Sequence, residues 1–146
     1  MEYVLMNQSH VTQIADLERL CFSMPWSENS IRSELNNPLS LCVVAQDNGT
    51  VAGYVGSQTV LGETDMMNIA VHPACRRNGV GRKLVLELIS RLKEQGSHAL
   101  ILEVRASNDP AIRLYEQLGF VQVGRRPNYY SQPKEDALIL RKEWSD

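Results

Sequence analysis

The segment from residue 65 to residue 104 constrains the fold more than any other, because it combines a strand, a glycine-containing turn, a long amphipathic helix and a second strand. Its helix carries a single apolar stripe, and the pattern stops at Gly96, a residue type that commonly ends helices. The stripe consists of Val80, Leu84, Val85, Leu88, Ile89 and Leu92. The apolar strand that follows, near 98–104, is typical of a strand covered on both faces. This combination indicates an α/β domain.

The spacing of apolar residues and the turn-forming residues predict the remaining elements. We expect strands near 3–6, 41–46, 50–60, 65–72, 98–104, 120–126 and 136–142, and helices near 11–22, after Ser27, after Gly81 and after Asn108 or Asp109. Asp47-Asn48-Gly49 is a strong hairpin signal, and a loop carrying residues 127–130 is expected between the last two strands. The order predicts an α/β fold with a mixed, mostly antiparallel sheet of about seven strands and four helices.

The composition is that of an ordinary soluble globular protein, with 146 residues of which 43% are hydrophobic and 22% charged, so one domain spanning 1–146 is expected. A net charge of −2 gives no general attraction to nucleic acid, and no apolar stretch approaches the roughly 20 residues of a membrane span. The three cysteines and three histidines are too dispersed for a disulfide framework or a metal site, and His10 and His98 are expected at the surface or at element edges. We therefore expect a cytoplasmic monomer without a metal and without a nucleic-acid or membrane partner.

Residues 76–81, Arg-Arg-Asn-Gly-Val-Gly, lie between a strand and a helix, which is an arrangement that binds anions. Amides in the first helical turn lack an internal partner, the helix dipole adds partial positive charge, and glycines let the backbone approach a phosphate. The basic residues beside the turn are Arg76, Arg77, Arg82 and Lys83. Leu84 stands where a dinucleotide motif needs a third glycine, and no Gly-Lys-Ser/Thr is present, so neither nucleotide motif fits. An ordinary glycine turn before a solvated helix is the alternative.

The spacing Arg-x-x-Gly-x-Gly, preceded by Asn-Ile-Ala-Val-His-Pro at 68–73, resembles the GNAT superfamily of acetyltransferases, and the order of elements over nearly the whole chain is similar to that fold too. The resemblance implies that two strands splay into a V, with acetyl-CoA in the gap. It implies that amides of residues 77–82 hold the pyrophosphate and that backbone groups of residues 69–71 hold the pantetheine arm and the thioester carbonyl. The implied cofactor-binding residues are Ile69, Ala70, Val71, Arg76, Arg77, Asn78, Gly79, Val80, Gly81, Arg82 and Asn108. Asn108 can serve as a helix cap and as a cofactor contact at once.

Four further segments, at 25–27, 102–108, 111–120 and 126–130, are similar to the bacterial RimI-type ribosomal-protein-alanine acetyltransferases. They read Pro-Trp-Ser, Leu-Glu-Val-Arg-Ala-Ser-Asn, Ala-Ile-x-Leu-Tyr-Glu-x-Leu-Gly-Phe and Arg-x-Asn-Tyr-Tyr. Enzymes of this family acetylate the N-terminal alanine of the eighteenth small-subunit ribosomal protein. Arginine at position 76 replaces the family's usual glutamine, which the superfamily pattern permits.

Glu103 and Tyr115 are the catalytic pair that the resemblance implies. Glu103 is the one charge in an otherwise apolar strand, and a carboxylate removed from water becomes a better proton acceptor near neutrality. From its spacing alone it could equally point into solvent or pair with Arg105. Tyr115 lies on the inward stripe of its helix, where a tyrosine usually makes a structural hydrogen bond. With the resemblance, Glu103 is expected to take a proton from the attacking amine, directly or through water, and Tyr115 to protonate the departing thiolate.

Two segments are implied to wall the acceptor channel. Met24, Pro25 and Trp26 lie between the first two helices, and Tyr129 and Tyr130 lie between the last two strands. Aromatic walls suit a peptide terminus, since they supply contact area, exclude water and carry a polar tip. The alternatives are a hydrophobic staple before the second helix for Trp26 and simple packing of the loop for the two tyrosines.

These residues predict direct transfer of an acetyl group from acetyl-CoA to the N-terminal α-amino group of a protein, with the N-terminal alanine of a small-subunit ribosomal protein as the first candidate. An α-amino group, with a pKa near 8, needs less help to lose its proton than a lysine, near 10.4. A small-molecule amine or a lysine side chain is the alternative acceptor. A non-catalytic acyl-CoA-binding module is the alternative from another class, and the presence of both Glu103 and Tyr115 disfavours it.

Overall fold

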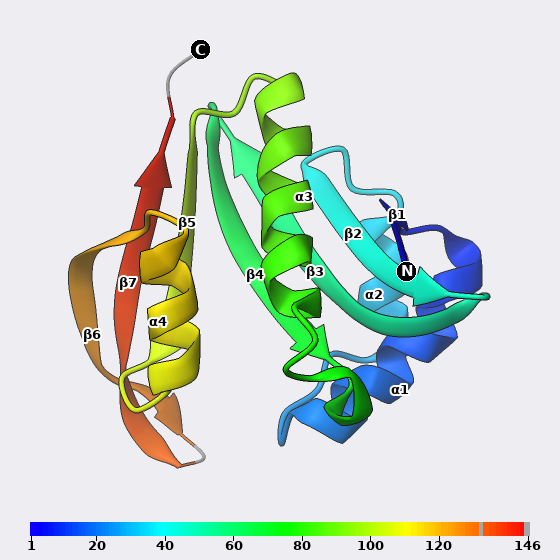
Figure 1. Cartoon of the computed structure of the whole chain (residues 1–146), viewed down its shortest axis with the longest axis horizontal. Helices are drawn as coiled ribbons and strands as arrows, with labels where there is room; N and C mark the ends of the chain where they lie inside the picture. The colour runs from blue at the N-terminus through cyan, green and yellow to red at the C-terminus, as the bar shows by residue number, and fades with distance from the viewer. Residues whose placement is uncertain (132, 145–146) are drawn as a thin grey trace.

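A seven-stranded sheet in the order β1-β2-β3-β4-β5-β7-β6 forms the centre of the computed structural model, which describes residues 1–131 and 133–144 (Figure 1). The strands are β1 Glu2–Leu5, β2 Ser40–Asp47, β3 Thr50–Val60, β4 Glu63–Val71, β5 Ala99–Arg105, β6 Val121–Ser131 and β7 Lys134–Glu143. The helices are α1 Val11–Cys21, α2 Glu28–Glu34, α3 Val80–Glu94 and α4 Asp109–Gln117. Only β4 and β5 pair in parallel among the described strands. The predicted mixed, mostly antiparallel sheet with four helices is confirmed.

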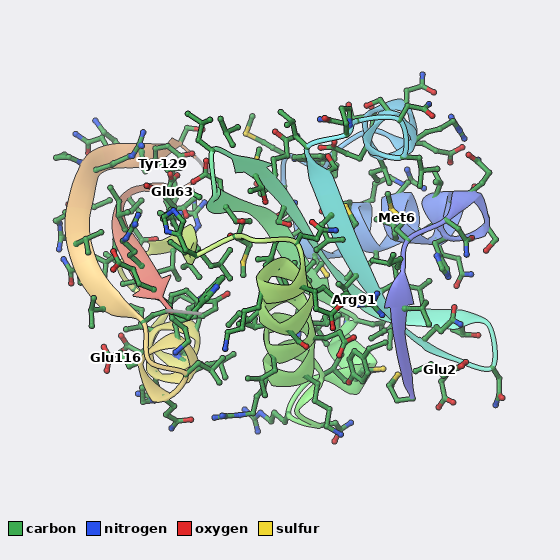
Figure 2. The ribbon with its side chains drawn as sticks, turned by 90° about the horizontal axis from the view of Figure 1, so that it is seen from above. Glu2, Met6, Glu63, Arg91, Glu116 and Tyr129 are labelled. Atoms are coloured by element: carbon green, nitrogen blue, oxygen red, sulfur yellow. The ribbon has the colours of Figure 1, made fainter. Side chains whose placement is uncertain are left out.

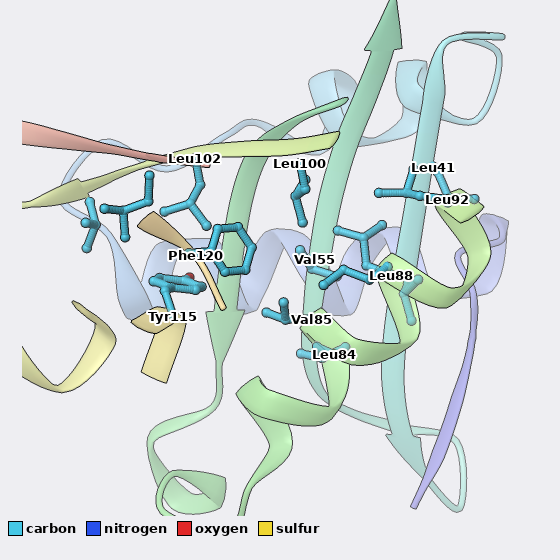
Figure 3. Close-up of a cluster of buried hydrophobic side chains, with 14 of the residues drawn as sticks. Leu41, Val55, Leu84, Val85, Leu88, Leu92, Leu100, Leu102, Tyr115 and Phe120 are labelled. Atoms are coloured by element: carbon cyan, nitrogen blue, oxygen red, sulfur yellow. The ribbon is translucent and has the colours of Figure 1, made fainter. Parts of the chain in front are cut away.

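The helices cover both faces of the sheet, with α3 and α4 on one side and α1 and α2 on the other (Figure 2). The stripe of α3 packs against the strands with Leu84, Leu88 and Leu92 fully buried (Figure 3). A second core lies under α1 and α2, where Ile14 and Ile31 pack against the opposite face. Among the described residues, no helix combines the length and the apolar character needed to cross a membrane.

The sheet opens between β4 and β5, which start side by side and then diverge (Figure 1). Their pairing covers three residues, from Glu63 opposite Ala99 to Asp65 opposite Ile101. Beyond this point β4 runs on to Val71 beside β3, and β5 runs on to Arg105 beside β7. We call this opening the V; it divides the sheet into a part with β1–β4 and a part with β5–β7.

The hairpin prediction at Asn48-Gly49 is confirmed, because both residues have positive φ (52° and 82°), as a two-residue turn of this type requires. The expectation for β5 is wrong. Strand β5 is not covered on both faces: Leu102 and Val104 are buried, whereas the alternate residues, which include Glu103, are only partly buried. His10 lies at an element edge, one of its two expected placements: it ends a short 3-10 helix directly before α1, and it is buried there, where its ring accepts the Asn7 amide and contacts Gln46.

Residues 127–130 do not form the expected loop but belong to β6. The β6–β7 register moves from Arg126 opposite Ala137 to Tyr130 opposite Glu135, so three residues of β6 oppose one of β7. Asn128 has a φ of 56°, and its amide donates to the Asp136 carboxylate, which also accepts from Arg125 at 2.8 Å. Proline and asparagine misled the sequence interpretation because both are tolerated in a strand at such a bulge. We call residues 127–129 the β6 bulge.

Candidate active site

The turn before α3 presents unpaired amides to solvent beside the V. Gly79 is the N-cap residue, with a φ of 78°, and the first intrahelical bond runs from the Lys83 amide to the Gly79 carbonyl. The amides of the first turn, up to Arg82, therefore lie ahead of the helical hydrogen-bond ladder. Residues 76–79 are exposed, and Arg77 also has a positive φ of 68°. This geometry is suited to a phosphate-bearing ligand held mainly by backbone donors.

The basic side chains beside this turn are partly engaged by the protein itself. Arg76 turns back and donates to the carbonyl of Val71 at the end of β4 (3.2 Å), with Cys21 at 3.6 Å. Arg82 donates to Gln117 at the end of α4, so it links α3 to α4. These two arginines therefore shape the turn in addition to supplying positive charge near it.

Strand β4 supplies the wall of the V next to this turn. Val55 and Tyr54 of β3 lie opposite Ile69 and Ala70, so β3 occupies this edge of β4. On the other edge, pairing with β5 ends at Asp65 within the described residues. The backbone near residues 69–71 therefore borders the V, as the resemblance implied. We call residues 69–71 and 76–82 the donor side.

Glu103 lies two residues beyond the last β4–β5 pair, at the base of the V. Its side chain is 28% exposed, and its carboxylate is 3.7 Å from the guanidinium of Arg126 on β6. Arg105, the partner considered from the sequence, contacts Glu135 and the Pro133 carbonyl. The carboxylate is thus partly sheltered and remains accessible to a substrate.

Tyr129 and Tyr130 gather around this carboxylate. A hydrogen bond to Glu103 raises the pKa of Tyr129, whereas burial and the charge of Glu103 raise the pKa of Tyr130 to about 12. The two rings pack edge to face with centroids 5.1 Å apart. Arg126 lies over the Tyr129 ring at 5.6 Å, and Arg105 over the Tyr130 ring at 4.2 Å. Tyr129 and Glu116 of α4 lie on opposite sides of the sheet (Figure 2).

Tyr115 approaches the V from the α4 side. Its ring is 5% exposed and packs against Phe120, and its hydroxyl reaches Met66 of β4, 3.9 Å from the sulfur (Figure 3). A thioether is a weak acceptor, so the hydroxyl has donor capacity to offer. Burial, with a smaller contribution from Tyr130, raises the pKa of Tyr115 to about 12, which keeps the hydroxyl protonated at neutral pH. Because Leu102 shares a core with Tyr115 and alternates with Glu103, the predicted pair enters the V from opposite faces.

The two predicted acceptor segments come together although they are far apart in the sequence. Met24 is 68% exposed, and its sulfur lies 4.0 Å from the hydroxyl of Ser131 at the end of β6. Trp26 is partly buried against the core that contains Ile31, which agrees with a hydrophobic staple, and both residues line one pocket. The two interpretations of Trp26 are therefore compatible. We call residues 24–26 and 127–130 the acceptor side.

Asn108 caps α4, as one of its two predicted roles requires. Its side chain accepts the amide of Ala111 at 3.3 Å, and the residue is exposed. Ser27 caps α2 in the same way, accepting the amide of Ser30.

Two acidic residues beside the V escaped the sequence interpretation. Burial, followed by the charge of Glu103, raises the pKa of Asp65, which lies on β4 at the last pair with β5. Glu18 of α1 is fully buried and is hydrogen-bonded by three groups from other elements. The signal for Glu18 was a glutamate within the apolar stripe of its helix. No comparable signal marks Asp65.

Comparison with known proteins assigns the family. Residues 11–120 match the sequence profile of the Acetyltransferase (GNAT) family. The chain belongs to this family. It is 41% identical over 126 residues to the ribosomal protein bS18-alanine N-acetyltransferase of Escherichia coli strain K12, covering 85% of this chain and 84% of that protein. The expectation of a GNAT acetyltransferase similar to the ribosomal-protein-alanine enzymes is confirmed.

Solved structures agree with this GNAT assignment. The crystal structure of the ribosomal-protein-S18-alanine N-acetyltransferase from Escherichia coli superposes with a TM-score of 0.91 at 36% identity, covering 99% of this chain and 94% of that one. Arabidopsis thaliana NAA60 in complex with acetyl-CoA shares the fold, with a TM-score of 0.86, 18% identity and 97% coverage of both chains. In the part of the chain that the structure describes, no group of three His, Cys, Asp or Glu side chains is arranged to hold a metal ion.

Proposed function

We propose that this chain transfers an acetyl group from acetyl-CoA to the N-terminal α-amino group of a protein, with the N-terminal alanine of ribosomal protein bS18 as its acceptor. The observation that carries the proposal is the V, which Glu103 and Tyr115 enter from opposite faces and whose wall, β4, leads to the exposed amides before α3. The relatives named for this acceptor cover most of the chain, which supports the choice of substrate. One GNAT domain spanning residues 1–146 is part of the proposal.

The donor side fits the coenzyme in two respects. The free amides of the α3 turn suit a pyrophosphate, and the unpaired edge of β4 suits a ligand that hydrogen-bonds like a strand. Ile69, Ala70 and Val71 would hold the pantetheine arm, and residues 76–82 the pyrophosphate. Asn108, at the exposed start of α4, would add a side-chain contact. Acetyl-CoA supplies an activated acyl group as its thioester.

Glu103 would act as the proton acceptor for the attacking amine. The acceptor arrives as an ammonium, and a carboxylate 28% exposed at the base of the V can attract it and then take a proton, directly or through water. An α-amino group has a pKa near 8, so only modest assistance is needed at neutral pH. Tyr129, whose pKa is raised by its interaction with Glu103, would orient the carboxylate.

Tyr115 would donate to the sulfur that leaves. Its hydroxyl stays protonated at neutral pH because burial raises its pKa to about 12, and it points across the V toward β4. Backbone amides of β4 near residues 69–71 can stabilise the negative charge that develops on the thioester oxygen. The amine attacks the acyl carbon directly, so no covalent intermediate with the protein forms.

A competition between two peptides tests the acceptor assignment. One peptide begins with a free alanine and follows the bS18 N-terminus; the other has a blocked N-terminus and an internal lysine. We expect acetylation of the terminal nitrogen of the first peptide, located by tandem mass spectrometry. Faster acetylation of the blocked lysine peptide would overturn the terminal-amine assignment. Loss of one N-terminal acetyl group from ribosomal proteins in cells lacking this chain would identify the physiological target.

We further propose that the protein works as a monomer in the cytoplasm. Its three cysteines, Cys21, Cys42 and Cys75, are free thiols, the usual state in a reducing compartment. Size-exclusion chromatography with light scattering tests the monomer, because a stable dimer would elute at twice the mass of 16.5 kDa.

A further inference from the structure

Glu18 is an ionisable side chain placed entirely inside the protein, where burial raises the pKa of its carboxyl and hydrogen bonds from three other residues oppose that shift. It lies on α1 with no exposed surface, and its carboxylate accepts three hydrogen bonds. The Trp26 amide donates to one oxygen at 2.8 Å; the Tyr54 hydroxyl and the Asn68 side-chain amide donate to the other at 2.5 and 2.6 Å. A buried carboxylate is costly unless its oxygens are satisfied, and here both of them are.

All three partners are donors, and they come from three separate elements. Trp26 belongs to the segment between α1 and α2, Tyr54 to β3 and Asn68 to β4. An ionised carboxylate only accepts hydrogen bonds, so it matches three converging donors, whereas a glutamine would direct its own NH₂ group at one of them. A glutamine has the same shape, but it would keep all three hydrogen bonds only if the Tyr54 hydroxyl and the Asn68 amide both turned to accept from its NH₂ group.

The partners of Glu18 lie on both sides of the candidate active site. Trp26 is part of the acceptor side. Asn68 directly precedes residues 69–71 of the donor side and sits at a β4 irregularity, where Gly56 lies opposite Asn68 and Ser57 opposite Met66. Trp26, Tyr54 and Asn68 also line one mostly apolar pocket. A single buried carboxylate thus connects the two walls between which an acceptor would lie.

We propose that Glu18 is a positioning residue for the acceptor: its carboxylate holds the segment at Trp26 against β4 at Asn68 and so fixes the acceptor amine relative to the thioester. The proposal rests on the proposed acetyl transfer to an amine. Glu18 acts through Trp26 and Asn68 and touches neither the coenzyme nor the reacting atoms. Its replacement should therefore change acceptor use and leave coenzyme use almost unchanged.

Glu18→Gln is the first variant, measured with the alanine peptide and acetyl-CoA varied separately. We expect the KM for the peptide to rise about tenfold or more, because Tyr54 and Asn68 must then turn to accept from the new NH₂ group or one donor faces another, while the KM for acetyl-CoA changes less than about twofold. Thr64→Val is the matched control. Thr64 is also buried, lies at the other end of β4, and bonds to Thr59 and Ser97, so its loss should lower stability without altering the peptide KM.

A polarity exchange separates positioning from simple destabilisation. In Glu18→Gln/Asn68→Asp the amide and the carboxylate change places across the same contact, so the new carboxylate on β4 can accept from the amide introduced on α1 and from Tyr54. We expect the double variant to recover most of the peptide KM lost in Glu18→Gln. Failure of this rescue in a double variant that melts near the wild type, or equal increases in both KM values in Glu18→Gln, would overturn the proposal.

A fluorescence experiment tests the role of Glu18 without measuring catalysis, so its result does not depend on the proposed function. In a Trp144→Phe background, Trp26 is the only tryptophan, and quenching by acrylamide reports its exposure. We expect faster quenching in Glu18→Gln than in its parent and no change in Thr64→Val. If the wild type acetylates no peptide, the proposed function is wrong. Unchanged quenching in Glu18→Gln would separately reject the role of Glu18.

Discussion

The donor side and the acceptor side of the V are built in different ways. On the donor side, the amides before α3 and the free edge of β4 are backbone groups, placed by a positive φ at Gly79 and by the end of strand pairing at Asp65. On the acceptor side, contacts between residues that are apart in the sequence hold the wall, as between Met24 and Ser131 or between the Glu18 carboxylate and the Trp26 amide. One side follows from local chain geometry, and the other depends on long-range packing. A substitution on one side should therefore change the KM for one substrate and leave the KM for the other unchanged.

The largest effect is expected at the point where both sides meet. Glu103→Gln keeps the shape of the side chain but removes the proton acceptor, so kcat should fall about 100-fold or more. Acetyl-CoA binding, measured by calorimetry, should persist. Glu143→Gln, at the far end of β7 opposite Ala99, is the control and should leave kcat unchanged. An unchanged kcat in Glu103→Gln would remove this residue as the base.

Tyr115→Phe should have the next largest effect, lowering kcat about 10- to 100-fold with little change in acetyl-CoA affinity. The raised pKa, about 12, has a second consequence: the hydroxyl stays protonated up to about pH 10, so the variant should lower the rate without moving the alkaline limb of the kcat profile below that pH. Equal losses of kcat and of coenzyme affinity would indicate that Tyr115 serves packing instead.

Gly79→Ala should affect the donor side alone. An added methyl group meets no atom within 4 Å, so the only cost is the φ of +78°, which an L-residue adopts at about 1–2 kcal/mol. The amides would move, and the KM for acetyl-CoA should rise up to about tenfold while the peptide KM stays constant. Gly49→Ala is a matched control, since Gly49 has a φ of +82° and the same open surroundings in the β2–β3 hairpin. A rise in the peptide KM in Gly79→Ala would show that the two sides are not independent.

Asp136→Asn should give the smallest effect, a severalfold rise in peptide KM with acetyl-CoA unaffected. Hydrogen bonds from the Asn128 amide and from Arg125 lower the pKa of Asp136, so this carboxylate holds the β6 bulge in its ionised form. Because the folded-state pKa is the lower one, the stabilisation is complete above the usual value near 4 and is lost as the pH falls through the lowered value. Urea unfolding of wild type and variant from pH 6 to pH 3 should show a stability difference that shrinks with acid. A difference independent of pH would exclude this role.

The difference between local geometry and long-range packing also explains which features could be predicted from the sequence. The α3 stripe, the Asn48-Gly49 hairpin and the glycine turn before α3 are local patterns, and the structure has each of them where the residues predicted it. Anion binding at that turn stays a prediction. The β6 bulge was taken for a loop because the positive φ of Asn128 is supported by Asp136, which lies eight residues away on β7. Glu18 lies within the apolar stripe of α1, but its partners are 8, 36 and 50 residues away, so the local pattern could not show what the carboxylate binds. Contacts of this kind become visible only when the chain is folded.

The short pairing of β4 with β5, which covers three residue pairs, affects how strongly the two parts of the sheet are held together. Few strand hydrogen bonds join its two parts, so a ligand lying in the V and touching both parts adds contacts that the sheet itself lacks. Binding energy of this kind is also folding energy, about 2.7 kcal/mol when the ligand is present at 100 times its Kd. The resistance of this protein to unfolding and proteolysis should then follow the supply of its ligand, so that the chain persists longest where the ligand is abundant.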